Sequence, residues 1–367
     1  MNDFVITATR SMRGYALRVV EQLTKNPNFS QMAEAINGVE LLSTDRFADG
    51  EMEVSIKKSV RGKKVVLFTS SCRNDTGVEV EVAKIELYHA VDAIKRSQAK
   101  SIIVFEPYIS CSRSDRTTRR NSVGLWIHFK TLSSLGVKQI VTYQLHSNKS
   151  QCMLDPAVCY IDDVPALNLL ARYICNVYIR DIKTLEEEVR NTWAFCSVDA
   201  GGEKLAREFA NAFGAPLVVA HKQRDYSVSN KIESVSVLSA VSLENKVLWI
   251  VDDMIDTAGS VEGLIKALTV FKPREINAVA AHALFSPPAV MRLNRLSEEG
   301  LLQRIIVSDT VGTSAFTESI PFLEVVPSAE LSARVVGSII RNDSIGKMMR
   351  PFDAEKYLKS PNLFSSQ

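Results

Sequence analysis

Residues 247–260 read Val-Leu-Trp-Ile-Val-Asp-Asp-Met-Ile-Asp-Thr-Ala-Gly-Ser, which combines a strand, a turn and the start of a helix. The five apolar residues Val247 to Val251 predict a strand covered on both faces, as in a parallel sheet. Ser260 fits the N-cap of the helix that follows. Spacings of three, four and seven place a set of apolar residues on one face of that helix, namely Val261, Leu264, Ile265, Leu268 and Phe271.

The turn between this strand and helix has the chemistry of a sugar-phosphate site. Backbone N–H groups and the positive end of the helix dipole point into the loop formed by Asp256, Thr257, Ala258, Gly259 and Ser260. A phosphate there would be repelled by Asp252 and Asp253, so we expect these carboxylates to accept sugar hydroxyls or to face a magnesium ion. The alternative, in which the acids only cap the helix, explains one acid but not three acids and two hydroxyls.

Composition indicates an ordinary globular protein without a polyanionic partner. The 367 residues suffice for two domains, with 46% hydrophobic and 23% charged residues. A net charge of +2, from 44 basic and 42 acidic residues, gives no support for nucleic-acid binding. We find no membrane span and no signal peptide. Six scattered cysteines without a CxxC pair favour a reducing compartment, and we expect a cytoplasmic protein, with organellar targeting by a non-standard signal left open.

Strand-like and helical patterns alternate along the chain, which predicts an α/β fold with mostly parallel sheets. The expected strands are Lys64–Ser70, Ser101–Phe105, Gln139–Tyr143, Thr192–Val198, Leu217–Ala220, Val247–Val251, Ile276–Ala281, Ile305–Ser308 and Leu323–Val326. The expected helices are Val78–Arg96, Gly124–Ser134, Leu169–Arg190, Lys204–Phe213, Val261–Phe271 and Glu330–Ile340. The pattern runs twice, so we expect domains at 1–162 and 163–328, joined by a polar connection at 153–165 and followed by a C-terminal helix and mobile tail at 329–367.

Five further motifs carry side chains suited to a nucleotide or a phosphate. Phe47, in the turn with Asp49 and Glu51, offers a face for a purine, although the spacing alone favours a plain hairpin turn with one packed Phe. Arg113 lies in a basic loop after a strand, where it either binds phosphate or is simply solvated. His146 and Asp199 follow strands and could bind a ligand, although a lone histidine is more often structural and a simple strand-to-helix turn also accounts for Asp199. Lys222 and Arg224 follow another strand, on a loop that can close over a transferring phosphate or remain a solvated hairpin.

Residues 251–260 resemble the phosphoribosyl-pyrophosphate loop shared by type I phosphoribosyltransferases and ribose-phosphate pyrophosphokinases. The first-domain motifs favour the second family. Phe47 to Glu51, followed by Ser59 to Gly62, resembles its adenine-binding turn and the strand entry after it. This resemblance implies two similar domains of the type I phosphoribosyltransferase fold, each a mostly parallel sheet flanked by helices. The first domain would bind ATP and the second ribose 5-phosphate.

The resemblance also implies roles for individual residues of a ribose-phosphate diphosphokinase, which makes phosphoribosyl pyrophosphate and AMP. ATP would be bound by Phe47, Asp49, Glu51, Arg113, Asp115 and His146. Ribose 5-phosphate would be bound by Asp199, Asp252, Asp253, Asp256, Thr257, Ala258, Gly259 and Ser260. Mg²⁺ would lie at His146 and Asp199, and Lys222 and Arg224 would be catalytic. Because the family's adenine turn reaches ATP on a neighbouring subunit, a dimer-based homo-oligomer, up to a hexamer, is implied.

Three positions depart from the family's motifs and keep an alternative open. Cys111 stands where the family has tyrosine, Ser114 where it has glutamine, and Gln144 where it has aspartate. The alternative is a non-catalytic regulatory homologue that associates with catalytic subunits. Retention of Lys222 and Arg224 argues against it. A phosphoribosyltransferase acting on a nucleobase is a third possibility, but it leaves the first 150 residues unexplained.

Overall fold

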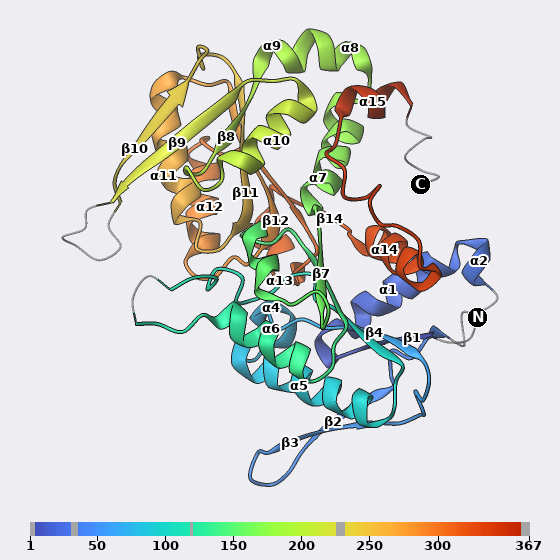
Figure 1. Ribbon diagram of the computed structural model, residues 1–367. Helices are drawn as coiled ribbons and strands as arrows, with labels where there is room; N and C mark the ends of the chain where they lie inside the picture. The colour runs from blue at the N-terminus through green and yellow to red at the C-terminus, as the bar shows by residue number, and fades with distance from the viewer. Residues whose placement is uncertain (1–3, 31–35, 118–119, 225–231, 361–367) are drawn as a thin grey trace. The chain divides into compact units, whose positions relative to one another are not determined.

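The structure is a computed structural model that describes residues 4–30, 36–117, 120–224 and 232–360, with only the backbone given for 222–224 and 232–234 (Figure 1). The chain forms two compact units. The first contains Met1–Pro165, Thr310–Gly312 and Pro327–Met349; the second contains Ala166–Asp309, Thr313–Val326 and Arg350–Gln367. The segment that we expected to stand apart from residue 329 onward is therefore divided between the two units. None of the described helices combines the length and hydropathy that a bilayer crossing requires.

The first unit is built on a five-stranded parallel sheet with strand order β1-β4-β5-β6-β7. A separate antiparallel hairpin, β2-β3, extends from it (Figure 1). The elements are β1 (Phe4–Ala8), α1 (Arg13–Thr24), α2 (Pro27–Ser30), β2 (Leu42–Arg46), β3 (Met52–Ile56), β4 (Lys64–Phe68), α4 (Arg73–Thr76), α5 (Val80–Arg96), β5 (Ser101–Phe105), α6 (Gly124–Ser134), β6 (Gln139–Tyr143), β7 (Tyr160–Val164) and α14 (Ala329–Arg341).

Helices cover both faces of this sheet. Leu87 and Val91 of α5 and Phe129 of α6 pack on one face with the aliphatic residues of β4, β5 and β6. An aromatic row from the three strands occupies the other face, where the rings of Phe68 and Phe105 stack at 4.7 Å. There α14 packs against α1, and the hydroxyl of Tyr15 lies 2.7 Å from Ser328 Oγ and from Ser332 Oγ. Residues from the far end of the sequence thus complete the first unit.

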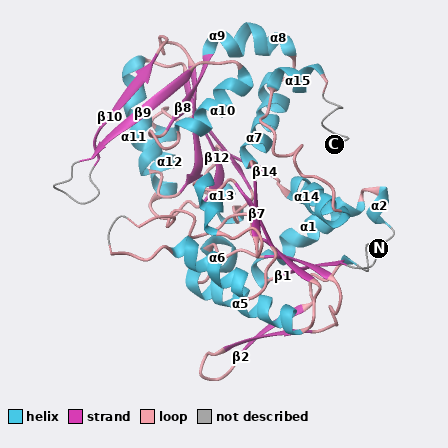
Figure 2. Ribbon diagram, viewed as in Figure 1, coloured by secondary structure: helices cyan, strands magenta, loops and turns pink. Residues whose placement is uncertain are grey.

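The second unit is built on a seven-stranded sheet with strand order β10-β9-β8-β11-β12-β13-β14, parallel except for the β9-β10 pair (Figure 2). Its elements are α7 (Ala166–Ile174), α8 (Ile182–Thr184), α9 (Arg190–Thr192), β8 (Trp193–Ser197), α10 (Glu203–Phe213), β9 (Leu217–Arg224), β10 (Ile232–Ser239), β11 (Val247–Ile255), α11 (Gly259–Leu268), β12 (Glu275–Ala283), α12 (Ala289–Glu298), β13 (Arg304–Ser308), α13 (Ser314–Thr317), β14 (Leu323–Val326) and α15 (Ala354–Lys359).

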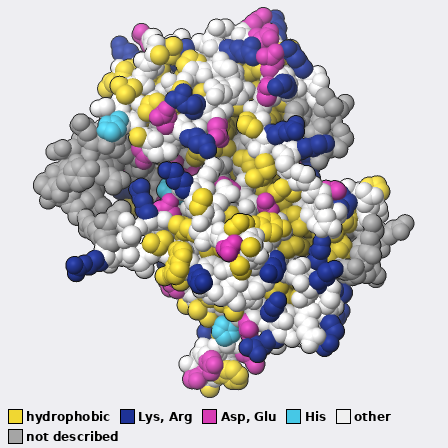
Figure 3. Space-filling model, viewed as in Figure 1, with side chains coloured by type: hydrophobic (Ala, Val, Ile, Leu, Met, Phe, Trp, Pro, Cys, Tyr) yellow, Lys and Arg dark blue, Asp and Glu magenta, His cyan; other side chains and the backbone are white. Residues whose placement is uncertain are grey.

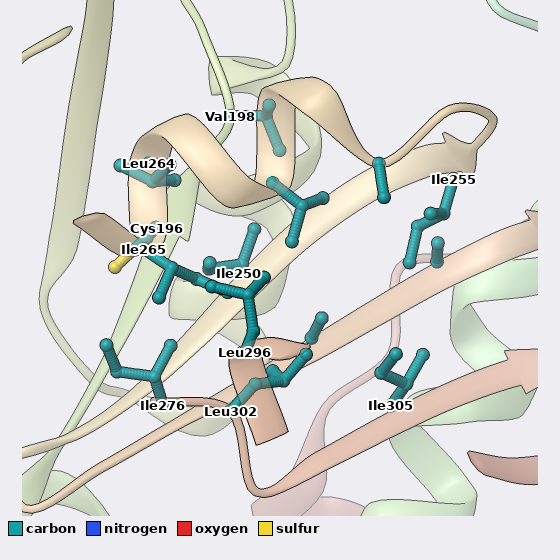
Figure 4. Close-up of a cluster of buried hydrophobic side chains, with 14 of the residues drawn as sticks. Cys196, Val198, Ile250, Ile255, Leu264, Ile265, Ile276, Leu296, Leu302 and Ile305 are labelled. Atoms are coloured by element: carbon teal, nitrogen blue, oxygen red, sulfur yellow. The ribbon is translucent and has the colours of Figure 1, made fainter. Parts of the chain in front are cut away.

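The core of the second unit explains why β11 is apolar throughout its first half. Leu264 and Ile265 of α11 lie over Ile250 of β11, in a cluster that also includes Leu296 of α12 (Figure 4). Trp249 faces the opposite way, where its ring lies 5.3 Å from that of Trp193, and α7 and α10 cover this side. A strand buried on both faces is the arrangement that its unbroken run of apolar residues predicts.

The predicted α/β fold with helix-flanked parallel sheets is confirmed. The single helix expected at Leu169–Arg190 is wrong, because the chain breaks at Arg180, which has a φ of 67°, and restarts with the Asp181 carboxylate accepting the N–H of Thr184 at 2.8 Å. The expected connection at 153–165 contains β7. Its acids fit an edge strand, since Asp162 accepts a hydrogen bond from Gln139 at 2.6 Å.

Candidate functional site

In the second unit, the strand order reverses between β8 and β11, which are neighbours in the sheet. From β8 the chain passes through α10 to β9 on one side, whereas from β11 it passes through α11 to β12 on the other. In open α/β sheets, a crevice forms outside the carboxyl ends of the strands at such a switch point, and ligands bind there. The two motifs that follow these strands begin at Asp199 and Asp252, so the fold brings them to one edge of the sheet.

Asp252 and Asp253 lie within the strand rather than after it. β11 extends to Ile255, so the expected end at Val251 is wrong. The parallel pairing continues because Asp252 is in register with Ala280 of β12 and Met254 with His282. Strand alternation turns neighbouring side chains to opposite faces. Accordingly Asp252 is partly exposed, whereas Asp253 is buried.

The helix after the loop begins earlier than expected. α11 starts at Gly259, and Ala258 occupies the N-cap position without a side-chain cap. Ser260 is therefore a helical residue, and its assignment as the N-cap is wrong. The turn is made by Ala258, whose φ of 59° lies in the left-handed region that is unfavourable for a residue with a Cβ. The helix also ends earlier, at Leu268, which leaves Phe271 exposed instead of on the core face.

Asp199 has a defined backbone role at the other half of this edge. Its Oδ1 accepts the N–H groups of Gly201 at 2.9 Å and of Gly202 at 3.1 Å, just before α10. Its charge also reaches the β11 acids. Partial withdrawal from water, then Asp253, and to a smaller extent Asp199, raise the pKa of Asp252 well above the ordinary carboxyl value. The three carboxylates therefore form one electrostatically coupled group.

Lys222 and Arg224 belong to a strand. β9 runs to Arg224 and pairs with β10, with Lys222 opposite Val235 and Arg224 opposite Ile232. The expected strand end at Ala220 is therefore wrong, because the antiparallel partner continues the ladder beyond the parallel sheet. The closing loop that we expected after Arg224 falls on residues 225–231, which lie outside the described residues.

In the first unit, the loop after β5 contains Arg113, which is exposed, and Asp115, which is partly exposed. Between them, Ser114 Oγ accepts the N–H of Gly124, the first residue of α6, at 2.9 Å. The serine that departs from the family's glutamine thus caps a helix from ten residues away. Cys111, the other departure in this loop, is buried, and burial raises the pKa of its thiol to about 12.

The loop after β6 holds His146, which is exposed at the carboxyl edge of the first sheet. Gln144 precedes it with a φ of 45° and a buried side chain. The Asp163 carboxylate accepts the N–H of Leu145 at 2.9 Å, so β7 supports this turn. Gln144 thus replaces the family's aspartate in this loop, but Asp163 of the neighbouring strand supplies an acid close to it.

The turn of the β2-β3 hairpin presents Phe47 to solvent, with 54% of its surface exposed. Phe47 N–H donates to Glu51 O at 2.9 Å, and Glu51 N–H donates to Asp49 Oδ1 at 3.0 Å. Figure 3 shows acidic and hydrophobic side chains together at this protruding tip. The Phe47 ring, exposed on a hydrogen-bonded turn, is accessible for stacking on a flat ligand.

Sequence reasoning missed two clusters. In the first unit, His128 Nε2 lies 2.9 Å from Glu106 Oε2, and His128 Nδ1 lies 3.0 Å from the hydroxyl of Tyr88. In the second unit, Arg292 of α12 donates to the backbone oxygen of Thr257. Neither has a local sequence signal, because the partners are 22 to 40 residues apart in the first cluster and 35 in the second. Among the described residues, no group of three or more His, Cys, Asp or Glu side chains is arranged to hold a metal ion.

Comparison with known proteins accounts for both units. A family model described as the N-terminal domain of ribose phosphate pyrophosphokinase matches residues 5–136, and a phosphoribosyl transferase domain model matches residues 176–289. A ribose-phosphate pyrophosphokinase of Prochlorococcus marinus subsp. pastoris is 32% identical over 346 residues, which cover 93% of this chain and 96% of the relative. The chain belongs to the ribose-phosphate pyrophosphokinase family. A family member from Nostoc is 31% identical over 348 residues, covering 94% of this chain and 97% of its own length.

A solved family structure has the same fold. The phosphoribosylpyrophosphate synthetase from Mycobacterium smegmatis aligns with a TM-score of 0.76 and 24% identity, covering 93% of this chain and 99% of that one. The family resemblance inferred from the sequence is thereby confirmed. Because the N-terminal domain model matches within the first unit, a lone phosphoribosyltransferase domain does not account for this chain.

Proposed function

We propose that this protein is a ribose-phosphate diphosphokinase that transfers the β,γ-diphosphoryl group of Mg-ATP to the 1-hydroxyl of ribose 5-phosphate. The products are phosphoribosyl pyrophosphate and AMP. The observation that carries this proposal is the convergence of Asp199, Asp252 and the 256–260 loop at the switch point of the second sheet. It is supported by identity above 30% to proteins named ribose-phosphate pyrophosphokinase over nearly the whole chain.

The second unit is assigned to ribose 5-phosphate. The sugar phosphate binds at Asp256 to Ser260, where the unsatisfied N–H groups of the first turn of α11 and the helix dipole favour an anion. The ribose hydroxyls donate to Asp252 and Asp253, with Asp199 beside them. Carboxylates that are partly withdrawn from water make stronger hydrogen bonds to a sugar than solvated ones do.

The first unit is assigned to ATP. The adenine stacks on Phe47 and bonds to Asp49 and Glu51, while Arg113, Asp115 and His146 hold the triphosphate. We assign Lys222 and Arg224 to stabilise the negative charge of the transition state, since phosphoryl transfer needs positioning and charge neutralisation more than covalent catalysis. Because the adenine turn extends away from its own sheet, a dimer-based homo-oligomer that pairs each turn with a neighbouring subunit's ATP is part of the proposal.

The donor set fits a magnesium ion that is held only in part by protein. Mg²⁺ prefers oxygen ligands and usually keeps several waters with one or two carboxylates plus substrate phosphates. Asp199 and Asp252 supply such oxygens, and the absence of a larger cluster in the described chain agrees with this mode. When bound, the ion would neutralise phosphate charge. His146 in the first unit and Asp199 in the second are each assigned as a magnesium ligand.

All six cysteines lie in the described part, none of them in a disulfide, which supports a cytoplasmic setting.

Purified full-length protein with ribose 5-phosphate, ATP and MgCl₂ tests the proposal, with AMP measured by chromatography. We expect one AMP for each phosphoribosyl pyrophosphate formed. When the ATP is labelled at its β- and γ-phosphates, the label should appear in the pyrophosphate group of that product. AMP formation no faster than in the Lys222→Ala protein would overturn the catalytic assignment. In that case, restoration of activity to a family catalytic subunit on mixing would identify the regulatory homologue instead.

A further inference from the structure

Arg292 lies directly behind the loop that we assign to the sugar phosphate. Its Nη1 donates to the backbone oxygen of Thr257 at 2.9 Å, and its Nε lies 3.2 Å from Glu262 Oε2. Glu262 is in the first turn of α11, so one guanidinium group connects the loop to the helix that follows it. The planar fork of arginine allows two such bonds in fixed directions, which a lysine ammonium does not.

Gly259 leaves the space that this arrangement needs. A Cβ at position 259 would lie 3.1 Å from Arg292 Nη1 and 3.9 Å from its Cζ. Because this contact is tighter than most Cβ contacts, a larger residue would require the guanidinium to shift by a few tenths of an ångström. The glycine therefore serves the approach of Arg292 from behind as well as the approach of an anion from the front.

The direction of the bond to Thr257 fixes the orientation of the next peptide group. In a trans peptide, the carbonyl oxygen and the following N–H point in opposite directions. With the Thr257 oxygen held by Arg292, the N–H of Ala258 is turned away from α12. The left-handed conformation of Ala258 then directs the chain into α11, whose first N–H groups have no intrahelical acceptor.

The surroundings hold Arg292 in place. Glu262 also pairs with Lys266 and Arg295, so three cations share one carboxylate. Although burial opposes it, these cations hold the pKa of Glu262 below its ordinary value. A net positive charge therefore lies on the α12 side of the loop, while the acids of β11 and Asp199 lie at its strand side.

We propose that Arg292 is a positioning residue for ribose 5-phosphate: it tethers the Thr257 carbonyl, presents the Ala258 N–H to the sugar phosphate and adds positive potential behind it. This inference rests on the proposed function, because it assigns the anion at that loop. It extends the binding site to α12, which none of the motifs of the sequence includes.

Two variants of α12 distinguish the hydrogen bond from Arg292 to the Thr257 oxygen, here called the tether, from the effect of positive charge on this helix. Arg292→Gln removes the tether, while Arg295→Gln removes the same charge from a residue that pairs with Glu262 and Glu299. We expect Arg292→Gln to raise the KM for ribose 5-phosphate about tenfold, the effect of losing one hydrogen bond from a charged donor, with kcat and the KM for ATP within about twofold. Arg295→Gln should change all three by less than about twofold. Equal effects of both variants would overturn the tether.

Conservative variants cover the case in which Arg292→Gln folds poorly. Arg292→Lys keeps the charge without the fork, and we expect it to weaken ribose 5-phosphate binding several-fold. Gly259→Ala displaces the guanidinium from the loop side and should act in the same direction. Wild-type affinity in Arg292→Lys would show that charge alone suffices and would overturn the proposal.

Hydrogen exchange of the unliganded protein provides a readout that does not depend on catalysis. The peptide spanning residues 254–262 should exchange faster in Arg292→Gln than in wild type and Arg295→Gln. Unchanged exchange there would contradict the tether. If wild type forms no AMP while exchange responds as expected, the proposed function fails and the tether stands.

Discussion

The imidazole of His128 bridges Glu106 and Tyr88 inside the first unit, and the His128 and Glu106 side chains are fully buried. Burial, and then Glu106, raise the pKa of Tyr88, so its hydroxyl stays protonated. The two ring nitrogens of His128 thus have hydrogen-bond partners on opposite sides, the hydroxyl of Tyr88 at Nδ1 and the carboxyl group of Glu106 at Nε2. Ser71 Oγ donates to the other oxygen of Glu106 at 2.8 Å, which connects the ends of β4 and β5.

Removing His128, which lies at the centre of this hydrogen-bonded network, should destabilise the protein strongly. We expect His128→Ala to lower the free energy of unfolding by about 3 kcal/mol, because it leaves a buried carboxylate without its partner. Tyr88→Phe should cost about 1 kcal/mol. Urea unfolding followed by circular dichroism measures both. His89→Ala is the control: this exposed histidine lies next to Tyr88 on α5, and its removal should change stability by less than about 0.5 kcal/mol. Similar losses for both histidines would contradict the role of the buried network.

The cap of α6 gives a second stability prediction. Ser114→Ala leaves the N–H of Gly124 without its acceptor and should lower stability by about 1 kcal/mol. Ser122 is closer in sequence to the helix start but exposed, so Ser122→Ala should have little effect. Thermal denaturation compares the two. A larger loss in Ser122→Ala would mean that the local serine, not the remote one, caps the helix.

The raised pKa of Asp252 makes stability depend on pH. A carboxyl group whose pKa is higher in the folded state binds more protons there than in the unfolded chain, so stability falls as pH rises from about 4 through the folded-state pKa. Asp252→Asn removes this loss while keeping an oxygen for the N–H of Asp253. We expect the variant to melt higher than wild type at pH 8, with the difference vanishing near pH 4. A difference that is constant with pH would refute the assignment.

Lys222 is expected to act on the reaction rather than on binding. Lys222→Ala should lower kcat at least about a hundredfold, with KM for either substrate changed far less, because the cation is needed where charge develops. Steady-state AMP formation measures this. Lys130→Ala, an exposed lysine on α6, controls for net charge and should leave kcat within about twofold. A kcat for Lys222→Ala near that of the control would remove Lys222 from the catalytic assignment.

Phe47 should be dispensable for folding but not for ATP. Because the ring is mostly solvent-exposed, Phe47→Ala should leave the melting temperature unchanged within about 1 °C. The KM for ATP should rise about tenfold through loss of stacking, and Phe47→Tyr should retain wild-type KM. An unchanged KM for ATP in Phe47→Ala would leave the β2-β3 turn without a role in nucleotide binding.

The sequence predicted the elements with strong local patterns and failed where distant partners decide. α6 and β14 have the expected bounds because apolar periodicity and flanking turn residues define them locally. β11 continues past Val251 because pairing with β12 holds two acids in the ladder, and β9 continues because β10 pairs with it. β7 was missed because its adjacent acids hide the strand pattern, and their partners, Gln139 and the N–H of Leu145, come from elsewhere.

The candidate site likewise contains residues that local sequence patterns predicted and residues whose roles depend on distant partners. Residues of the strand-turn-helix motif were recognisable because a helix start binds anions through its own backbone. The left-handed Ala258 was not, since its conformation is imposed by the turn rather than favoured by alanine. Arg292 was also missed, as was the helix-capping role of Ser114. Each acts on a backbone group of another segment, and such contacts leave no periodicity in the chain.

The packing of α14 on α1 has a consequence for synthesis on the ribosome. The strands of the first unit emerge within the first 165 residues, but α14, which helps α1 to cover the aromatic face of this sheet, comes much later, and its Ser332 Oγ lies 2.6 Å from the hydroxyl of Tyr143. At 5–20 residues per second, the ribosome completes α14 roughly ten to forty seconds after the strands of this sheet. During this interval the aromatic row of the nascent chain lacks the cover of α14. We therefore expect folding of the N-terminal half to be the first step that needs chaperones and that suffers when synthesis stops before α14.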